Sequence, residues 1–288
     1  SSAGDVNGDG FDDLIIGAPL ADLGGNSNGG ESYVVFGKSS GFPAAIDLSS
    51  LDGTHGFRLD GIDAHDRSGG SVSSAGDVNG DGFDDLIIGA LTADPGGNSN
   101  VGESYVVFGK SSSFPAAVDL STLDGTDGFR LDGMGELSGG SVSSAGDVNG
   151  DGFDDLVIGA RYGDPGGDSD AGESFVVFGK SSGFTAAVDL STLDGTDGFR
   201  LDGIDAGDFS GNSVSGAGDV NGDGFDDLII GARHADPGGD GIEGESYVVF
   251  GKSSGFSSAV DLSTLDGTDG FRLDGIDAGD TSGSAVSS

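Results

Sequence analysis

The 288-residue chain is built from four near-identical units. Each contains the segment DVNGDGFDD, which begins at Asp5, Asp77, Asp147 and Asp219, so successive copies are 72, 70 and 72 residues apart. A fixed period of this kind is the signature of a repeat architecture, in which each unit buries its apolar surface against its neighbours. We therefore predict a single domain over residues 1–288, with repeats spanning approximately residues 1–67, 68–137, 138–209 and 210–281.

The apolar runs of each unit predict four short strands and almost no helix. In the second unit these strands are residues 71–76, 85–90, 103–109 and 128–132. The two middle strands are apolar at consecutive positions, which is typical of strands buried on both faces, whereas the fourth alternates like an exposed edge. The segment DLSTLDG is long enough for about one helical turn. Four equal sheets with covered central strands predict an all-β fold, a β-propeller of four-stranded antiparallel blades.

The two ends of the chain carry complementary parts of one unit. The chain ends SGSAVSS, which matches residues 68–74, and begins SSAGDV, which matches the sequence from residue 73 onward. Residues 282–288 are therefore predicted to complete the first blade and close a ring of four blades. A larger ring completed by other copies, or a fibre segment, is the alternative.

Composition excludes several classes of function. The formal net charge is -39, from 50 acidic and 11 basic residues, which argues against a nucleic-acid partner because phosphate neutralisation needs Lys and Arg. The same charge opposes docking on anionic lipid, and the apolar runs are too short for direct membrane insertion. Because the chain has no cysteine, disulfides cannot supply rigidity to a sequence that contains 60 glycines.

The acidic segment has the spacing of a calcium loop. Counted from its first aspartate, oxygen side chains stand at positions 1, 3, 5 and 9, the residue at position 7 offers its backbone carbonyl, and a glycine at position 6 permits a sharp turn. The distal Glu of an EF-hand loop is missing, since position 12 is Ile16 in the first copy. Oxygen donors without His or Cys favour Ca²⁺ over zinc or copper.

The alternative interpretation is an Asp/Asn/Gly turn that only links two strands. Four copies that keep every ligand position favour four Ca²⁺ sites. The predicted ligands are Asp5, Asn7, Asp9, Phe11 and Asp13; Asp77, Asn79, Asp81, Phe83 and Asp85; Asp147, Asn149, Asp151, Phe153 and Asp155; and Asp219, Asn221, Asp223, Phe225 and Asp227.

The segment AGDVNGDGFDDLIIGAP, followed by YVVFG, resembles the FG-GAP repeat of integrin α-subunit propellers and their bacterial relatives. The resemblance covers all four units. It implies that each repeat forms one blade, with the calcium loop between its first and second strands. The chain departs from the pattern in having Ser68-Gly69 and its equivalents where the family has Phe-Gly, and a Gly-Ala-Pro element only at residues 17–19. Family members usually form seven blades, so a four-bladed ring is a further departure.

The resemblance and the loops predict a calcium-binding, extracellular or cell-surface module for adhesion or for binding a protein or glycan ligand, with Ca²⁺ in a structural role. The alternative is a non-catalytic structural unit of a bacterial surface fibre or layer, which pairs with other copies of itself through open edge strands. A lectin, or an accessory domain of a larger enzyme, is a weaker hypothesis.

We predict no enzymatic activity, because the three histidines occupy unrelated positions of the repeat and form no catalytic pattern with Ser or Asp. Two further features have functional and purely structural interpretations. A second Asp/Asn/Glu loop follows each DLIIGA strand, and an Asx-rich hairpin loop explains it better than a metal site. Arg161, Tyr162, Arg233 and His234 occupy equivalent positions, where they form either a ligand surface or ordinary surface variation.

Overall fold

The computed structural model describes residues 1–22, 24–97, 100–134, 137–239 and 241–287. Its strands form four sheets, one for each repeat. The first consists of β1 (Ser2–Gly4), β2 (Asp13–Ala18), β3 (Glu31–Val35), β4 (Gly56–Asp60) and β8 (Ala117–Asp119). The second consists of β5 (Ser71–Gly76), β6 (Asp85–Ala90), β7 (Glu103–Val107), β9 (Gly128–Asp132) and β13 (Ala187–Asp189).

The third and fourth sheets repeat this arrangement. The third consists of β10 (Ser141–Gly146), β11 (Asp155–Ala160), β12 (Glu173–Val177), β14 (Gly198–Asp202) and β18 (Ala259–Asp261), and the fourth of β15 (Ser210–Gly218), β16 (Asp227–Ala232), β17 (Glu245–Val249) and β19 (Gly270–Asp274). Helical structure in the described residues is limited to 3₁₀ turns: η1 (Leu48–Ser50), η2 (Pro95–Gly97), η3 (Leu120–Thr122), η4 (Pro165–Gly167), η5 (Leu190–Thr192) and η6 (Leu262–Thr264). The predicted all-β fold is confirmed.

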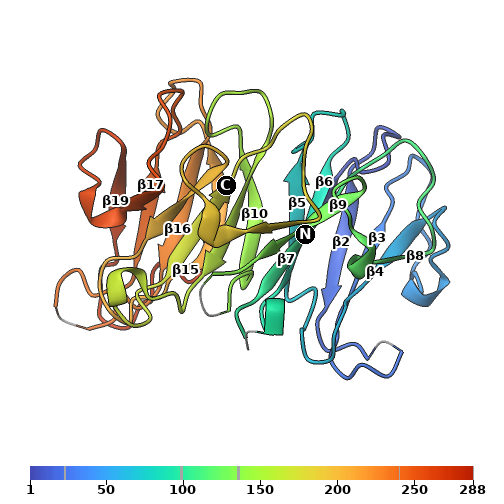
Figure 1. Cartoon of the computed structure of the whole chain (residues 1–288), viewed down its shortest axis with the longest axis horizontal. Helices are drawn as coiled ribbons and strands as arrows, with labels where there is room; N and C mark the ends of the chain where they lie inside the picture. The colour runs from blue at the N-terminus through green and yellow to red at the C-terminus, as the bar shows by residue number, and fades with distance from the viewer. Residues whose placement is uncertain (23, 98–99, 135–136, 240, 288) are drawn as a thin grey trace.

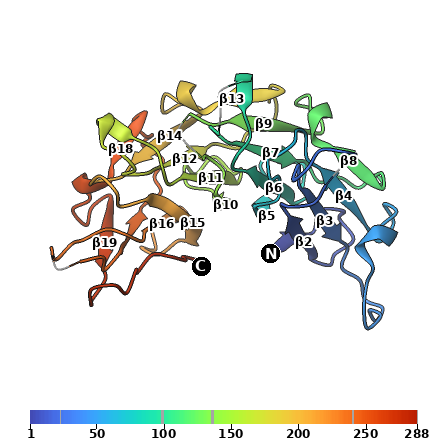
Figure 2. The same cartoon turned by 90° about the horizontal axis from the view of Figure 1, so that it is seen from below.

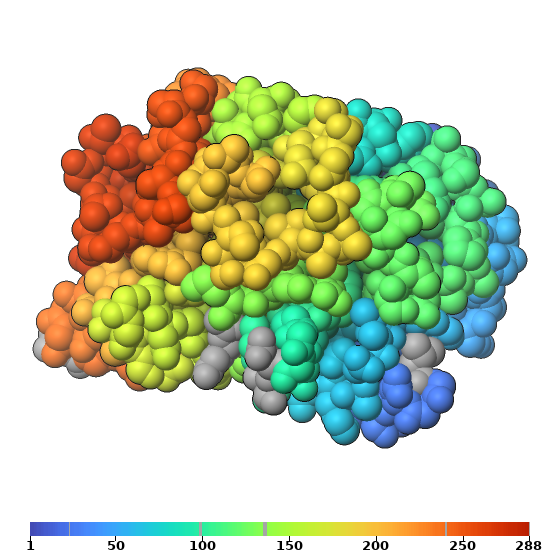
Figure 3. All heavy atoms as spheres, viewed as in Figure 1, coloured from blue at the N-terminus to red at the C-terminus, as the bar shows by residue number. Residues whose placement is uncertain are grey.

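The sheets stand side by side in chain order (Figure 1). Seen from below, they fan out in an arc around their first strands, as the blades of a propeller do (Figure 2). Among the described residues, no hydrogen bond joins the first sheet to the fourth, and the first and last repeats lie at opposite ends of the molecule (Figure 3). The structure is therefore an open arc of four blades.

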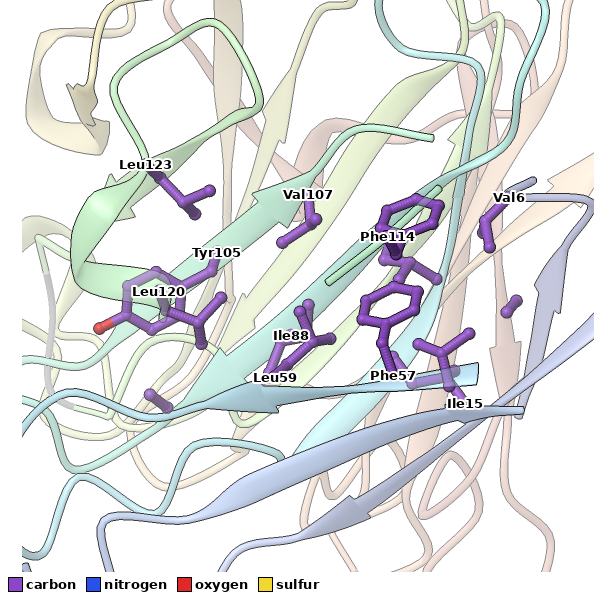
Figure 4. Close-up of a cluster of buried hydrophobic side chains, with 14 of the residues drawn as sticks. Val6, Ile15, Phe57, Leu59, Ile88, Tyr105, Val107, Phe114, Leu120 and Leu123 are labelled. Carbon is purple, nitrogen blue, oxygen red and sulfur yellow. The ribbon is translucent and has the colours of Figure 1, made fainter. Parts of the chain in front are cut away.

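The core lies between neighbouring blades because both faces of the middle strands are apolar. Every residue of β6 and β7 is buried, as their consecutive apolar positions predict. Figure 4 shows the cluster between the first and second sheets, where the rings of Phe57 and Phe114 face each other. Equivalent clusters fill the second and third interfaces.

A fifth strand joins each of the first three sheets to the next repeat, which the sequence interpretation missed. β8 belongs to the second repeat but pairs in parallel with β4 of the first. In the same way, β13 of the third repeat pairs with β9 of the second, and β18 of the fourth pairs with β14 of the third. The predicted edge strand is therefore covered in these three sheets. We call residues 114–119, 184–189 and 256–261, together with the equivalent residues 42–47 of the first repeat, the clasps.

The C-terminal segment lies beside the fourth sheet. Val286 N donates to Ser213 Oγ at 3.0 Å, in the way that Val214 N donates to Ser141 Oγ at 3.1 Å one blade earlier. The segment thus occupies the place of the first strand of a following blade. Because this contact of Val286 is with the fourth blade, the predicted role of the segment in completing the first blade stays a prediction.

Candidate metal centre

Each acidic loop connects the first and second strands of its sheet. In the second repeat β5 ends at Gly76 and β6 begins at Asp85, so residues 77–84 form the connection. The pairing register shifts between Ser74 and Gly76, just before the loop, which leaves room for the turn. Because all four sheets repeat this order, all four loops lie at the same end of their blades.

Inside each loop the side chains bind backbone amides of the same loop. In the second repeat, Asp77 accepts hydrogen bonds from Asp81 N at 3.0 Å and Gly82 N at 2.9 Å. Asn79 Oδ1 accepts from Asp81 N at 2.8 Å, and Asp81 Oδ1 accepts from Phe83 N at 3.1 Å. These bonds fold the loop into successive Asx turns, so the oxygens at positions 1, 3 and 5 are held within one short segment.

The aspartate at position 9 is buried and holds the loop to the sheet. Asp85 is fully buried and accepts hydrogen bonds from Val78 N at 3.0 Å and Gly109 N at 2.8 Å. The pKa of Asp85 is raised to about 8, mainly by burial; the two amides act in the opposite direction, and the nearby carboxylates of Asp81 and Asp77 contribute to the rise. The same amide pair holds Asp13, Asp155 and Asp227.

The donor chemistry of the loops fits a hard cation, but the side chains do not converge as a metal shell. Among the described residues, no group of three or more His, Cys, Asp or Glu side chains is arranged to hold a metal ion. The carboxylates instead accept hydrogen bonds from backbone amides. Mutual repulsion nevertheless acts at each site, since the carboxylates at positions 1 and 5 both raise the pKa of the one at position 9 in the first three repeats. A cation would relieve this repulsion.

Sequence reasoning missed that the loops also contact one another. The aspartate at position 8 points to the preceding loop, so that Asp154 Oδ2 accepts from Asp77 N at 2.7 Å. The same contact joins Asp84 to Asp5 and Asp226 to Asp147. The available signal was the pair of adjacent aspartates at positions 8 and 9 of the motif. The aspartate at position 9 accepts a hydrogen bond from its own loop, and the one at position 8 accepts a hydrogen bond from the preceding loop.

The second acidic loops are organised as hairpin connections. Asp22 Oδ1 accepts from Asn28 N at 2.8 Å, and Asp164 Oδ1 accepts from Asp170 N at 2.7 Å. The glutamate that follows lies in another network, where Glu103 accepts from the hydroxyl of Tyr105 and forms an ion pair with Arg130. Two members of these loops, Asn98 in the second copy and Asp240 in the fourth, lie outside the described residues.

The variable positions after β11 and β16 form one cluster, at the end of these strands opposite the acidic loops. Arg161 lies over the ring of Tyr162, and Tyr162 packs edge-on against Phe209. Arg233 lies over the ring of Phe209, 5.7 Å from its centre, and His234 packs edge-on against the same ring. Burial lowers the pKa of His234, with Arg233 adding to the effect.

In the described ranges, no helix is long and apolar enough to span a bilayer.

Comparison with known proteins agrees with this architecture. The FG-GAP repeat family matches residues 1–35, 68–107, 138–177 and 210–249. A phosphatidylinositol-glycan-specific phospholipase D of Bos taurus is 33% identical over 166 residues, which cover 58% of this chain and 19% of the phospholipase. Integrin alpha-5 of Xenopus laevis is 31% identical over 241 residues, covering 82% of this chain and 20% of the integrin.

Integrin alpha pat-2 of Caenorhabditis elegans is 29% identical over 241 residues, covering 81% of this chain and 17% of the integrin. The chain thus spans about a fifth of the length of these relatives. Each of the four matched segments begins near the first strand of a blade and ends in its third, so the acidic loop lies inside every match. The chain belongs to the FG-GAP repeat family.

Proposed function

We propose that the chain is a calcium-binding propeller module of the cell exterior or cell surface, which binds a protein or glycan partner and is not itself catalytic. The observation that carries this proposal is the fourfold occurrence of one oxygen donor set, in loops that contact one another between neighbouring blades. Because the carboxylates of each loop repel one another, a divalent cation stabilises the folded state more than the unfolded chain, where the charges are farther apart.

The residues that would hold Ca²⁺ are the side chains at positions 1, 3, 5 and 9 and the carbonyl at position 7 of each loop. When bound, Ca²⁺ supplies positive charge and ties the turn to the start of the second strand. Asp154 accepts a hydrogen bond from the preceding loop, so ordering one loop also orders the contact between two blades. Calcium therefore replaces disulfides as the source of rigidity in this chain.

The candidate partner surface is the cluster of Arg161, Tyr162, Phe209, Arg233 and His234. It brings two arginines together in a chain with only 11 basic residues and 50 acidic ones. Arginine forks and aromatic edges favour a carboxylate-bearing ligand, either an acidic peptide or an acidic sugar. The resemblance to integrin α-subunits supports a binding role, and the resemblance to a phospholipase D is compatible with an accessory role in a longer protein.

Calcium titration by isothermal calorimetry tests the proposal. The unaltered chain is expected to bind four Ca²⁺ ions, and the double variant D77N/D81N is expected to bind three. The control is D127N/D197N, which removes the same charge from exposed side chains that are 71% and 68% accessible. Equal stoichiometry in D77N/D81N and the unaltered chain, or no heat of calcium binding at all, contradicts the proposal.

A further inference from the structure

The three interfaces between neighbouring blades are built from the same contacts. In the first interface, Phe114 of the clasp stacks on Phe57 with ring centres 4.2 Å apart, and both pack against Phe36. The second and third interfaces repeat the stack at 4.5 and 4.1 Å. Each trio takes two rings from one blade and the third ring from the clasp of the next repeat.

The two ends of the molecule carry the separated halves of a fourth such interface. In the last blade, Phe250 and Phe271 form the first two rings of the trio, with centres 5.8 Å apart. The third ring is Phe42 of the first repeat, which is 53% exposed, whereas its equivalent Phe114 is 5% exposed. Leu273 on β19 is 47% exposed, while the equivalent Leu131 and Leu201 are fully buried.

Backbone groups at the two ends are complementary as well. Between the first two repeats, Lys110 N donates to Val6 O at 2.9 Å and Arg58 N donates to Ala116 O at 3.0 Å. The corresponding groups of a fourth interface are Lys38 N with Val220 O, and Arg272 N with Ala44 O. Val220 is 54% exposed, whereas Val6 is fully buried.

Three glycines of the last repeat show that its surface is shaped for another blade. A Cβ atom on Gly8 would collide with Phe83 of the next loop, but one on the equivalent Gly222 would have no described residue within 4 Å. Gly218 and Gly267 also face open space, although a Cβ on their equivalents in the first three repeats would collide with an aspartate or with the backbone of a clasp. The last repeat keeps the clearance for a neighbour that this chain does not place there.

The innermost strands match in the same way. β2 exposes Leu14 and Ile16, whereas their equivalents Leu86 and Ile88 in the second repeat are buried in the cluster between the first and second sheets. Val286 is the C-terminal equivalent of Val72. It lies beside the fourth blade, where the first strand of a following blade belongs.

We infer that these two surfaces are the head and tail of an interface between copies of this chain, in which the first blade of one copy packs against the fourth blade of another. The clasp at residues 42–47 would cover β19 of the partner copy, as residues 114–119 cover β4. The partner is identified by continuity with the three interfaces inside the chain, since both halves carry the same residue types. The inference uses apolar and backbone contacts and does not depend on calcium binding.

Such a contact joins different surfaces, so copies associate head to tail into a closed ring or an open filament. The high negative charge opposes association at low ionic strength, and salt screens this repulsion over about 8 Å at physiological ionic strength. Association is therefore expected to strengthen as salt is raised from low to physiological concentration.

Sedimentation velocity over a range of protein concentrations tests the inference at physiological salt with calcium present. The unaltered chain is expected to shift from the 28.2 kDa monomer to multiples of that mass as concentration rises. The L273D variant places a charge on an already exposed position of β19 and is expected to stay monomeric. The S182D control adds the same charge to an exposed loop of the third repeat and is expected to associate normally. A monomer at every concentration, or equal association of L273D and the unaltered chain, overturns the inference.

Cysteine crosslinking separates association from closure within one chain. The chain has no cysteine, so I46C and L273C introduce thiols only at positions equivalent to the paired residues Val118 and Leu59. Mixed single variants are expected to yield an I46C–L273C disulfide dimer under mild oxidation, and the double variant is expected to yield longer crosslinked products. A double variant that forms only an internal disulfide shows ring closure and overturns the inference. Calcium stoichiometry measured on monomeric L273D keeps this result separate from the calcium proposal.

Discussion

The aspartates of one acidic loop perform different tasks although they look alike in the sequence. Asp81 is exposed and binds amides only within its own loop, whereas Asp85 is buried and joins the loop to two neighbouring segments. The difference follows from position: residue 81 lies at the tip of the turn, and residue 85 begins β6. A motif described only by its ligand positions does not separate these roles.

Replacing the two aspartates by alanine should therefore give different results in calcium-free protein. D85A leaves the buried amides of Val78 and Gly109 without an acceptor, at a cost of about 1–3 kcal/mol each in the free energy of unfolding. D81A leaves exposed amides that water can satisfy and should change stability little. Urea unfolding in EDTA measures both, and equal midpoints for the two variants would show that Asp85 has no structural role of its own.

A glutamate begins the third strand of each blade. In the first, second and fourth repeats this glutamate accepts a hydrogen bond from a tyrosine, but in the third repeat the tyrosine is replaced by phenylalanine. The hydroxyls of Tyr33, Tyr105 and Tyr247 donate to the glutamate two residues earlier. The third repeat has Phe175 at this position, and Glu173 Oε2 is buried with no hydrogen-bond partner among the described residues. Burial accordingly raises the pKa of Glu173, with Arg200 acting in the opposite direction.

The F175Y variant should stabilise the protein by about 1.5–3 kcal/mol, because the added hydroxyl gives a buried charged group the hydrogen bond that it lacks. Y105F is the reverse change in the second repeat and should destabilise by a similar amount. Differential scanning calorimetry of both variants measures the effect. A lower melting temperature for F175Y would mean that the third blade has no room for the hydroxyl.

At the scale of elements, the clasp of one repeat packs against the preceding blade and holds the two blades together. Its strand β8 adds three residues to the edge of β4, and Phe114 places a ring in the aromatic trio. The 3₁₀ turn η3 follows the clasp directly, and the side chain of Asp119 caps this turn by accepting a hydrogen bond from Ser121 N. Because the strand is short, most of the stabilisation comes from the buried rings and not from backbone pairing.

The same substitution at two equivalent clasp positions tests whether the buried ring supplies most of the stabilisation. F114A removes a buried ring and should destabilise the fold by about 3–5 kcal/mol. F42A removes the corresponding exposed ring of the first repeat and should change the stability of a monomer by less than about 0.5 kcal/mol. Chemical unfolding in the monomeric L273D background measures both variants free of association. Equal losses would contradict the assignment of the clasp as an interblade fastener.

At the scale of the whole molecule, four thin blades hold together through three repeated interfaces and carry a net charge of -39. Each interface brings two acidic loops into contact, so charge repulsion is concentrated where blades meet. Under the proposed calcium binding, cations that neutralise those loops would stabilise the arc, which has no disulfides.

Chelation should lower the melting temperature sharply and reversibly. A site in free calcium at 100 times its dissociation constant contributes about 2.7 kcal/mol, so four sites contribute on the order of 10 kcal/mol. That sum is comparable with the whole net stability of an ordinary domain, about 5–15 kcal/mol. Thermal scans with calcium, with EDTA, and after calcium is restored measure the effect. Superimposable scans in calcium and EDTA would remove the structural role of the metal.

The strands, the acidic loops and the family could be predicted from the sequence because local patterns decide them. Consecutive apolar residues predict a strand buried on both faces wherever it lies, and β6 and β7 are such strands. The Asp/Asn/Gly spacing likewise determines the turn at Asp77 through hydrogen bonds within a few residues.

The fifth strand, the contacts between loops and the open arc were decided by tertiary structure alone. Residues 117–119 carry no pattern that names β4 as their partner, and Asp84 has the same side chain as Asp85 beside it. Near-identical repeats make this ambiguity general, because the edge of any unit fits the edge of any other. Local sequence therefore specifies what each blade presents to a neighbour, and only the three-dimensional arrangement determines which neighbour, in the same chain or another, receives it.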